Sequence, residues 1–340
     1  MNARDAALLL PAILMLAAGP AATAQEHTIK FATIAPDGTS WLTTMKEFDA
    51  AVRKESNGKM GFRIYAGGSQ GEDKDFIRKM RLGQLQSAGI TGVGLGDIAP
   101  KVRILDSPFL FQNTAEVDHV LNTFDAEFSK AFEENGYVLL GWAEVGFAHV
   151  FTNVPVKSGQ DMKGVKMWMW EGDPVAEAAF KALELRPIPL SVIDVMTSLQ
   201  TGLIDGAYAS PYGAVALSWH TRVKYMMNPP LANAMGAVLI TRKKWDALTP
   251  DLQEILKRNG RKYMALLTQR SREDNAKAIG TLAKNNVQVV DATSPQQLKE
   301  FAEVGRRARQ SLVGKLYDQD LLTRVEKAVA DFRAKGKAGK

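Results

Sequence analysis

The chain of 340 residues predicts an α/β fold with mostly parallel sheets, divided into two domains. The first observation is that strand-like and helix-like segments alternate along it, which is typical of parallel sheets covered by helices. The second is the length, which is sufficient for two domains. The third is a helical pattern from Thr249-Pro250 to about Lys284. Such a helix measures about 50 Å and can bridge two domains.

The first unit begins with an alternating strand-like segment at 28–34, followed by the turn Pro36-Asp37-Gly38. Thr39 or Ser40 can cap a helix whose apolar stripe recurs at helical spacing. A strand at 62–65 ends at Gly67-Gly68, and a second helix follows. The same alternation then continues through a small, apolar, buried-type strand at 87–93, a helix at 117–132 and a strand at 137–142.

The second unit begins near Phe147. Asp173-Pro174 predicts a helix start, with Asp173 as the N-cap, and Ser191 with Asp194 forms the pattern of a capping box. The apolar segment 236–241 predicts a buried strand that returns to the first unit, and Ser294-Pro295-Gln296-Gln297 predicts another capped helix start. No long linker separates the units, so we expect several crossings that form a hinge.

The N-terminal segment predicts export. Residues 6–18 form an apolar run of signal-peptide length, and Ala22-Thr23-Ala24 is an A-x-A cleavage site. We therefore expect a signal peptide at 1–24. Because the chain has no cysteine, thiol and disulfide chemistry and an N-terminal lipid anchor are excluded. These features predict a soluble periplasmic protein without a lipid anchor.

Composition excludes several function classes. With 46% hydrophobic and 24% charged residues the chain has the composition of an ordinary globular protein. Its net charge is +6, but the basic residues form no stripe interleaved with aromatic residues, so nucleic acid is not an expected partner. Four histidines without an H-E-x-x-H pattern predict no zinc-type metal site. The glycines of Gly92-Val93-Gly94-Leu95-Gly96 are too closely spaced for dinucleotide binding, so we expect no cofactor.

One motif suggests an enzyme. Gly67-Gly68-Ser69-Gln70-Gly71 matches G-x-S-x-G between a strand and a helix, and His119, His149 and His220 lie downstream as possible bases. The alternative interpretation is a tight turn whose glycines relieve backbone constraints. A periplasmic serine hydrolase that uses Ser69 therefore stands as an alternative function.

The segment 164–170 carries two indoles. If it is a strand, Val165, Met167 and Met169 share one face, while Lys166, Trp168 and Trp170 share the other. The first face predicts core packing. The second face, if it lines a cleft, presents two aromatic rings and an ammonium group. Aromatic residues at this spacing are also common in a core.

Several motifs resemble those of the periplasmic solute receptors of tripartite ATP-independent (TRAP) transporters, of the C4-dicarboxylate-receptor type. That family has a G-x-K-x-R strand and an A-L-Q-x-G-x-x-D-G segment. This chain keeps the matching residues Gly164, Lys166, Leu199, Gln200, Gly202, Asp205 and Gly206. The resemblance covers nearly the whole mature chain and implies a two-domain periplasmic binding protein with hinge crossings.

The resemblance also shows departures. The family's strand arginine grips the ligand's carboxylate, and Trp168 stands at its place. The family's G-F-R segment reads Gly146-Phe147-Ala148. A bidentate arginine–carboxylate pair is strong and selective, so tight dicarboxylate binding by the usual route is not expected.

The expected domains are 25–146 with about 234–270, and 147–233 with about 271–335, around a ligand cleft. The resemblance implies a receptor that closes on a small organic solute (an organic acid, or an aromatic or cationic molecule) and delivers it to a TRAP permease. We expect a monomer that is not an enzyme; a sensor's ligand-binding subunit is a further alternative. The expected ligand-binding residues are Trp41, Glu72, Thr91, Phe147, Trp168, Trp170, Tyr208 and Ser210.

Overall fold

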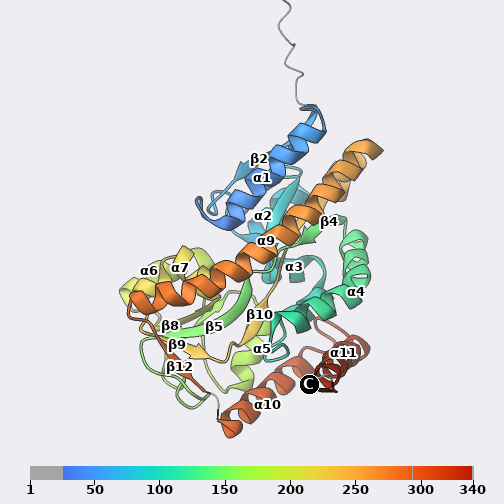
Figure 1. Ribbon diagram of the computed structural model, residues 1–340. Coiled ribbons are helices and arrows are strands. Elements are labelled where there is room, and N and C mark those ends of the chain that lie inside the picture. The colour runs from blue at the N-terminus through green and yellow to red at the C-terminus, as the bar shows by residue number, and fades with distance from the viewer. Residues whose placement is uncertain (1–25, 293, 339–340) are drawn as a thin grey trace, which may run out of the picture.

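The computed structural model describes residues 26–292 and 294–338. The expected signal peptide lies outside the described residues. Two five-stranded sheets and a two-stranded sheet form the framework. We call the first sheet with its covering helices lobe I, and the other two sheets with theirs lobe II (Figure 1).

The sheet of lobe I has the strand order β2-β1-β3-β11-β4. Its strands β1, β2 and β3 are parallel, whereas β11 runs antiparallel to both β3 and β4. The strand bounds are β1 His27–Ala32, β2 Met60–Tyr65, β3 Ser87–Thr91, β4 Tyr137–Trp142 and β11 Gly236–Thr241.

Helices α1 to α4 begin where the sequence places caps and breaks. Thr39 caps α1 by accepting from the Leu42 amide, and Asn113 caps α4 by accepting from the Glu116 amide. Gly67 and Gly68, at φ of 63° and 70°, form the turn before α2. The bounds are α1 Ser40–Glu55, α2 Asp73–Arg81, α3 Gly92–Ile98, the 3-10 helix η1 Pro100–Asp106 and α4 Thr114–Glu134.

The main sheet of lobe II has the order β10-β5-β9-β12, with β8 paired to β5, and β6 pairs with β7 in a small parallel sheet. The strands are β5 Gly146–Thr152, β6 Trp168–Trp170, β7 Ile188–Leu190, β8 Gly206–Ala209, β9 Tyr225–Asn228, β10 Ala232–Ala234 and β12 Gln288–Asp291. The helices between them are α5 Pro174–Ala182, η2 Val192–Asp194, α6 Val195–Thr201, α7 Pro211–Ala216 and η3 Trp219–Thr221.

The long helix α9, Pro250–Lys284, follows the short helix α8, Arg242–Asp246, and spans both lobes. It contacts α1 and β4 of lobe I and α7 of lobe II, and Figure 1 shows it running diagonally across the molecule. Gly260 permits this close approach, because a Cβ there would lie 2.6 Å from the Leu140 carbonyl oxygen of β4. The helix predicted from Thr249-Pro250 to about Lys284 is confirmed.

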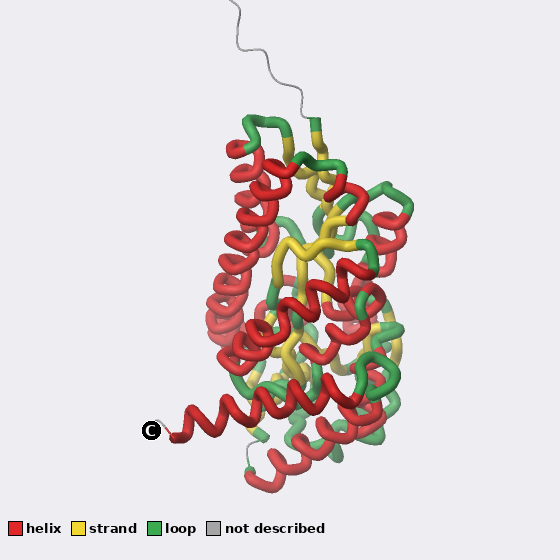
Figure 2. The backbone as a smooth tube through the Cα atoms, turned by 90° about the vertical axis from the view of Figure 1, so that its right-hand side faces the viewer, coloured by secondary structure: helices red, strands yellow, loops and turns green. Residues whose placement is uncertain are grey.

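The C-terminal helices α10, Pro295–Ser311, and α11, Gln319–Ala338, lie at the end of the molecule opposite to the start of the described chain (Figure 2). Helix α10 contacts α5, while α11 contacts α4. The capping box predicted at Ser294 and Gln297 is present at the start of α10.

The α/β class and the two-domain binding-protein fold are confirmed, with sheets that mix parallel and antiparallel pairs. The carboxyl end of β3, at Thr91, pairs with Gly236 at the start of β11. Since β11 enters lobe I directly from β10 of lobe II, it starts at the edge where β3 ends and must run in the opposite direction. Hinge crossings without an intervening helix therefore produce the antiparallel pairs.

Two of these crossings lie side by side. One joins β4 to β5 through residues 143–145, and the other joins β10 to β11 through Met235. The amide of Ala143 donates to the Gly236 carbonyl at 2.8 Å, and the amide of Val145 donates to the Ala234 carbonyl at 3.0 Å. The two lobes are thus joined by a paired connection and by α9.

Candidate functional site

Side chains of both lobes meet along one seam. Glu72, which precedes α2, accepts hydrogen bonds from the Trp170 indole Nε1 at 3.1 Å and from the Ser191 hydroxyl at 2.9 Å. Lys74 Nζ donates to the Glu171 carbonyl at 3.2 Å. We call these residues, with Arg103 and Asp173, the interlobe seam. Glu72 and Trp170 were both predicted as ligand-binding residues.

The capping box expected from Ser191 and Asp194 does not form. Ser191 is the residue before η2, but its side chain makes no capping hydrogen bond to that helix. Its hydroxyl donates instead to Glu72 of lobe I. The charged acceptor is the stronger partner, which explains why the local cap is lost. The N-cap predicted at Asp173 does form, with Asp173 accepting from the Val175 amide.

A buried ion cluster also crosses the seam. Arg103 of η1 is 3% exposed, and its Nη1 lies 3.0 Å from Asp106 Oδ2 while its Nη2 lies 2.5 Å from Asp173 Oδ1. Arg103 and Asp106 belong to lobe I, and Asp173 belongs to lobe II. Burial raises the pKa of Asp106 to about 6, although Arg103 and the Met235 amide oppose the shift.

The glycines of α3 make room for this cluster. A Cβ on Gly92 would lie 1.9 Å from Asp106 Oδ2 and 2.6 Å from Arg103 Nη1. A Cβ on Gly96 would lie 2.8 Å from Arg103 Cγ. The arginine therefore lies along the face of α3 that Gly92 and Gly96 share. The closely spaced glycines of this segment thus accommodate a buried arginine.

Thr91 belongs to a second buried network. Asp73 Oδ2 accepts hydrogen bonds from the Thr91 amide at 3.1 Å, from the Thr91 hydroxyl at 2.5 Å and from the Gly94 amide at 3.3 Å. The other oxygen, Oδ1, is buried and has no hydrogen-bond partner. Burial raises the pKa of Asp73 to about 7, despite these hydrogen bonds, which lower it. Thr91 therefore contributes two of the hydrogen bonds that hold Asp73.

Aromatic rings adjoin the seam in lobe II. The rings of Trp168 and Tyr208 are stacked at 4.8 Å, and Trp170 and Trp219 lie 6.0 and 5.4 Å from Trp168. The Trp170 amide donates to the Tyr208 hydroxyl at 3.1 Å. Burial, followed by the nearby charge of Asp173, raises the pKa of Tyr208. Trp168, Trp170, Tyr208 and Glu72 therefore form one connected group.

Trp168 lies in the core of lobe II rather than on an open surface. It is 2% exposed, and its indole Nε1 donates to the Leu190 carbonyl at 3.0 Å. Met167, the residue before β6, is also buried, and Met169 on the face of β6 opposite to Trp168 is half-buried. Trp170, which is half-buried, is the indole of this strand that contacts lobe I.

The other predicted residues lie elsewhere around the lobes. Trp41 donates from Nε1 to Ser271 Oγ of α9 at 2.8 Å, and its ring lies 5.0 Å from that of Tyr212 in α7. Ser210 is buried and caps α7 by accepting from the Gly213 amide. Phe147 of β5 is half-buried and packs against a core cluster that joins residues of lobe I to Val175 and Ala178 of α5.

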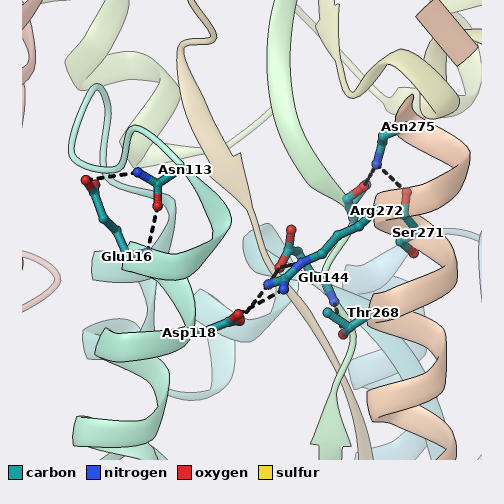
Figure 3. Close-up of polar contacts among 9 residues, drawn as sticks. Asn113, Glu116, Asp118, Glu144, Thr268, Ser271, Arg272 and Asn275 are labelled. Carbon is teal, nitrogen blue, oxygen red and sulfur yellow. Dashed lines mark hydrogen bonds and ion pairs between the residues drawn. The ribbon is translucent and has the colours of Figure 1, made fainter. Parts of the chain in front are cut away.

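The paired crossing is anchored to α9 by a polar network (Figure 3). Arg272 Nη2 contacts Glu144 Oε2 at 2.5 Å and Asp118 Oδ1 at 2.6 Å. Asn275 Nδ2 donates to the Val145 carbonyl at 2.8 Å, and the Glu144 amide donates to the Thr268 hydroxyl at 3.3 Å. One helix thus holds consecutive residues of the crossing.

The enzyme alternative finds no support in the arrangement of its residues. Ser69 is exposed in the glycine turn. The His149 and His220 ring nitrogens lie next to the carbonyl oxygens of Met227 and Ala214, and the ring of His119 stacks on Phe332. Within residues 26–292 and 294–338, no cluster of three or more His, Cys, Asp or Glu side chains is suited to a metal.

A cavity of about 980 Å³ lies away from the seam, and none of the eight predicted residues lines it. It is bordered by α10, α11 and the segments near Phe109, Lys163 and Glu184. Across the described part of the chain, none of the helices combines the length and apolar character needed to cross a bilayer.

Sequence reasoning missed Asp73, Arg103 and Asp106. Arg103 and Asp106 lie three residues apart within the apolar run of η1, where both neighbours of Arg103 are buried. A charged pair at this spacing among buried apolar residues was the available signal. Asp73 carried no comparable signal, because an acidic residue in the first turn of a helix is common.

Comparison with protein families gives a match over most of the chain. The model described as bacterial extracellular solute-binding protein, family 7 (DctP), matches residues 31–315. A solute-binding protein of Verminephrobacter eiseniae is 27% identical over 278 residues, which cover 81% of each chain. The 2,3-diketo-L-gulonate-binding periplasmic protein YiaO of Escherichia coli is 26% identical over 278 residues, 81% of this chain and 84% of its own.

Solved structures share the fold. The sugar acid binding protein DctPAm of Advenella mimigardefordensis, in complex with galactonate, has a TM-score of 0.84 at 22% identity, covering 89% of this chain and 98% of that one. A TRAP periplasmic solute binding protein of Xanthobacter autotrophicus, with bound β-D-galacturonate, has a TM-score of 0.82 at 21% identity, covering 89% and 99%. At these identities the likeness concerns the fold.

Proposed function

Because the chain belongs to family 7 of the bacterial extracellular solute-binding proteins, we propose that it captures a small organic solute between its two lobes. The solute is then delivered to a TRAP permease in the inner membrane. TRAP solute-binding proteins are periplasmic, and the apolar run and A-x-A site before residue 25 support cleavage and export of this chain. The functional unit is a monomer.

One observation carries this proposal: the connected group of Glu72, Trp170, Tyr208 and Trp168 joins lobe I to the aromatic rings of lobe II. A solute held here would be enclosed when the lobes close, and its release would require the Glu72 hydrogen bonds to break. Hinge closure around a ligand is an established mode of conformational change. The domain bounds that we propose for this motion are 25–146 with about 234–270, and 147–233 with about 271–335.

The aromatic side chains at the seam indicate the chemical class of the solute. Tyr208 and Trp170, which are half-buried, offer flat apolar faces, and Trp168 supports Tyr208 from the core. The carboxylates of Glu72 and Asp173 lie beside them. Aromatic faces bind planar ligands by stacking and bind cations through the ring quadrupole. Sugar acids, which several structures of similar fold contain, are also candidates because they are small organic acids.

Two measurements test the receptor function. Mass spectrometry of gently purified protein identifies a co-purified solute, and small-angle scattering then compares the apo protein with the protein saturated by that solute. We expect a smaller radius of gyration with the solute bound. A radius unchanged at saturation would contradict capture by lobe closure.

A further inference from the structure

Arg103 is an unusual arginine within this chain. The guanidinium is planar, and its Nε–H points in the same direction as one N–H of Nη2, so this edge can bind both oxygens of one carboxylate. Arg333 binds Glu116 in this way, with Nε–Oε1 at 2.9 Å and Nη2–Oε2 at 2.7 Å. Arg306 binds Glu303 likewise, at 2.8 and 2.6 Å.

On Arg103 only one of the two donors of this edge has a hydrogen-bond partner. Nη2 contacts Asp173 Oδ1, while Nε is buried and has no hydrogen-bond partner. Asp173 cannot turn freely toward Nε, because the same Oδ1 accepts from the Val175 amide at 3.0 Å and caps α5. A buried donor without a partner is unfavourable, because it has lost its hydrogen bonds to water. The Nε–H of Arg103 therefore lacks an acceptor oxygen.

The two carboxylates on Arg103 differ in their dependence on lobe closure. Asp106 lies on η1 with Arg103 and also accepts from the Met235 amide at 2.7 Å, so it stays with lobe I. Asp173 is carried by lobe II. When the lobes separate, Arg103 keeps Asp106 and loses Asp173, and its Nε and Nη2 donors become available together.

We propose that Arg103 is the residue that binds a carboxylate of the solute, and that Asp173 occupies this position in the absence of solute. This assignment rests on the proposed receptor function and names the solute class as organic acids. The solute carboxylate would bind Nε and Nη2 together, as Glu116 binds Arg333. Tyr208, whose hydroxyl group lies close enough to be influenced by Asp173 and Arg103, would contact the remainder of the solute.

The glycines of α3 support this role. Gly92 and Gly96 leave the space in which Arg103 lies against the helix, and Asp106 of the same lobe contacts Nη1, so the guanidinium has partners in lobe I that do not depend on Asp173. A binding arginine needs such fixed geometry, because the gain from a bidentate pair depends on alignment.

The test uses calorimetry and thermal shift on the mature protein with D-galacturonate, succinate, benzoate, benzamide and benzamidine as probes. The last three share one ring and differ in charge. We expect acids to bind and their neutral or cationic counterparts to bind more weakly. R103K keeps the positive charge between the two aspartates but lacks the planar edge, and it should bind acids about tenfold more weakly.

D173N should have the opposite effect. Asparagine can still cap α5, so the helix start is preserved, but the competing charge is removed. We expect acids to bind about tenfold more tightly. E116Q is the matched control, because it weakens the buried carboxylate pair of Arg333 away from the seam, and acid affinity should stay unchanged.

The outcomes separate this inference from the receptor function. Equal acid affinity in the wild type and R103K would overturn the role of Arg103. If benzamidine or a co-purified cation binds and acids do not, the assignment of organic acids is wrong while the receptor stands. If no solute of any charge binds or co-purifies, the receptor function itself is contradicted.

Discussion

The Trp170 indole of lobe II donates to the Glu72 carboxylate of lobe I at 3.1 Å, and the same Glu72 oxygen accepts from the Ser191 hydroxyl at 2.9 Å. One side chain therefore joins two separate segments of lobe II to α2. Hydrogen bonds to a charged group contribute about 1.5–3 kcal/mol each, which is comparable to the free-energy difference between open and closed states of many proteins.

The first prediction concerns closure. E72A removes both hydrogen bonds, so the solute-free protein should shift toward the open state and show a larger radius of gyration by small-angle scattering. S191A removes only the hydrogen bond from Ser191 and should shift the equilibrium toward the open state less than E72A does. Because Glu72 also caps α2 together with Asp75, D75A is the control for capping alone. An equal expansion in D75A and E72A would assign the effect to the helix start.

The second prediction separates the two indoles of β6. Trp168 is 2% exposed, and W168A should lower the free energy of unfolding by about 3–5 kcal/mol because it creates a large cavity. Trp170 is half-buried, so W170A should cost less in stability and act mainly on closure. Urea unfolding measures the loss of stability, and small-angle scattering measures the change in closure. A larger stability loss in W170A would contradict this division.

The third prediction concerns pH and Asp73. Its folded pKa is about 7, above the ordinary value of 3.8, so the folded state holds a proton that the unfolded chain has released. The resulting stability is fully present below pH 4 and is lost as the pH rises to about 7. The wild type should therefore lose up to about 4 kcal/mol relative to D73N across this range. Urea titrations at four pH values measure the difference.

A flat difference between the wild type and D73N would show that Asp73 has an ordinary pKa when folded. An increase in the relative stability of the wild type with pH would mean that the hydrogen bonds from Thr91 and Gly94 outweigh burial. The comparison with D73N cancels the titration of other groups, including Asp106.

Local signals in the sequence predicted much of the fold. Thr249-Pro250 located the start of α9, Asp173-Pro174 that of α5, and Gly67-Gly68 the turn before α2. Such signals are local because a proline or a capping side chain acts on its own turn. The antiparallel direction of β11 was not predicted, because it depends on how the chain returns from lobe II.

The candidate site was harder to predict, because its contacts join residues far apart in sequence. Ser191 has the pattern of a local cap, yet it donates to Glu72, which lies 119 residues away. Strand alternation suggested a core face and a cleft face for the segment 164–170, but Met167 and Trp168, one from each face, are both buried. A periodic pattern shows which residues share a face and does not show what covers that face.

The last prediction concerns the hinge. Arg272 of α9 contacts Glu144, whose side chain is 1% exposed, and Asp118, whose side chain is 47% exposed (Figure 3). R272M leaves the buried Glu144 charge without its partner, and this should cost about 3–5 kcal/mol of stability. D118N removes the exposed partner and should cost no more than about 1 kcal/mol. Burial already raises the pKa of Glu144 despite Arg272.

The double variant R272M/E144Q tests the cause. Since it removes both charges, it should recover much of the stability that R272M loses, as measured by urea unfolding. Burial without Arg272 should raise the pKa of Glu144 further, so R272M should also regain stability as the pH falls and Glu144 is protonated. If R272M and the double variant are equally unstable at every pH, the packing of Arg272 on the crossing, rather than its charge, holds the hinge.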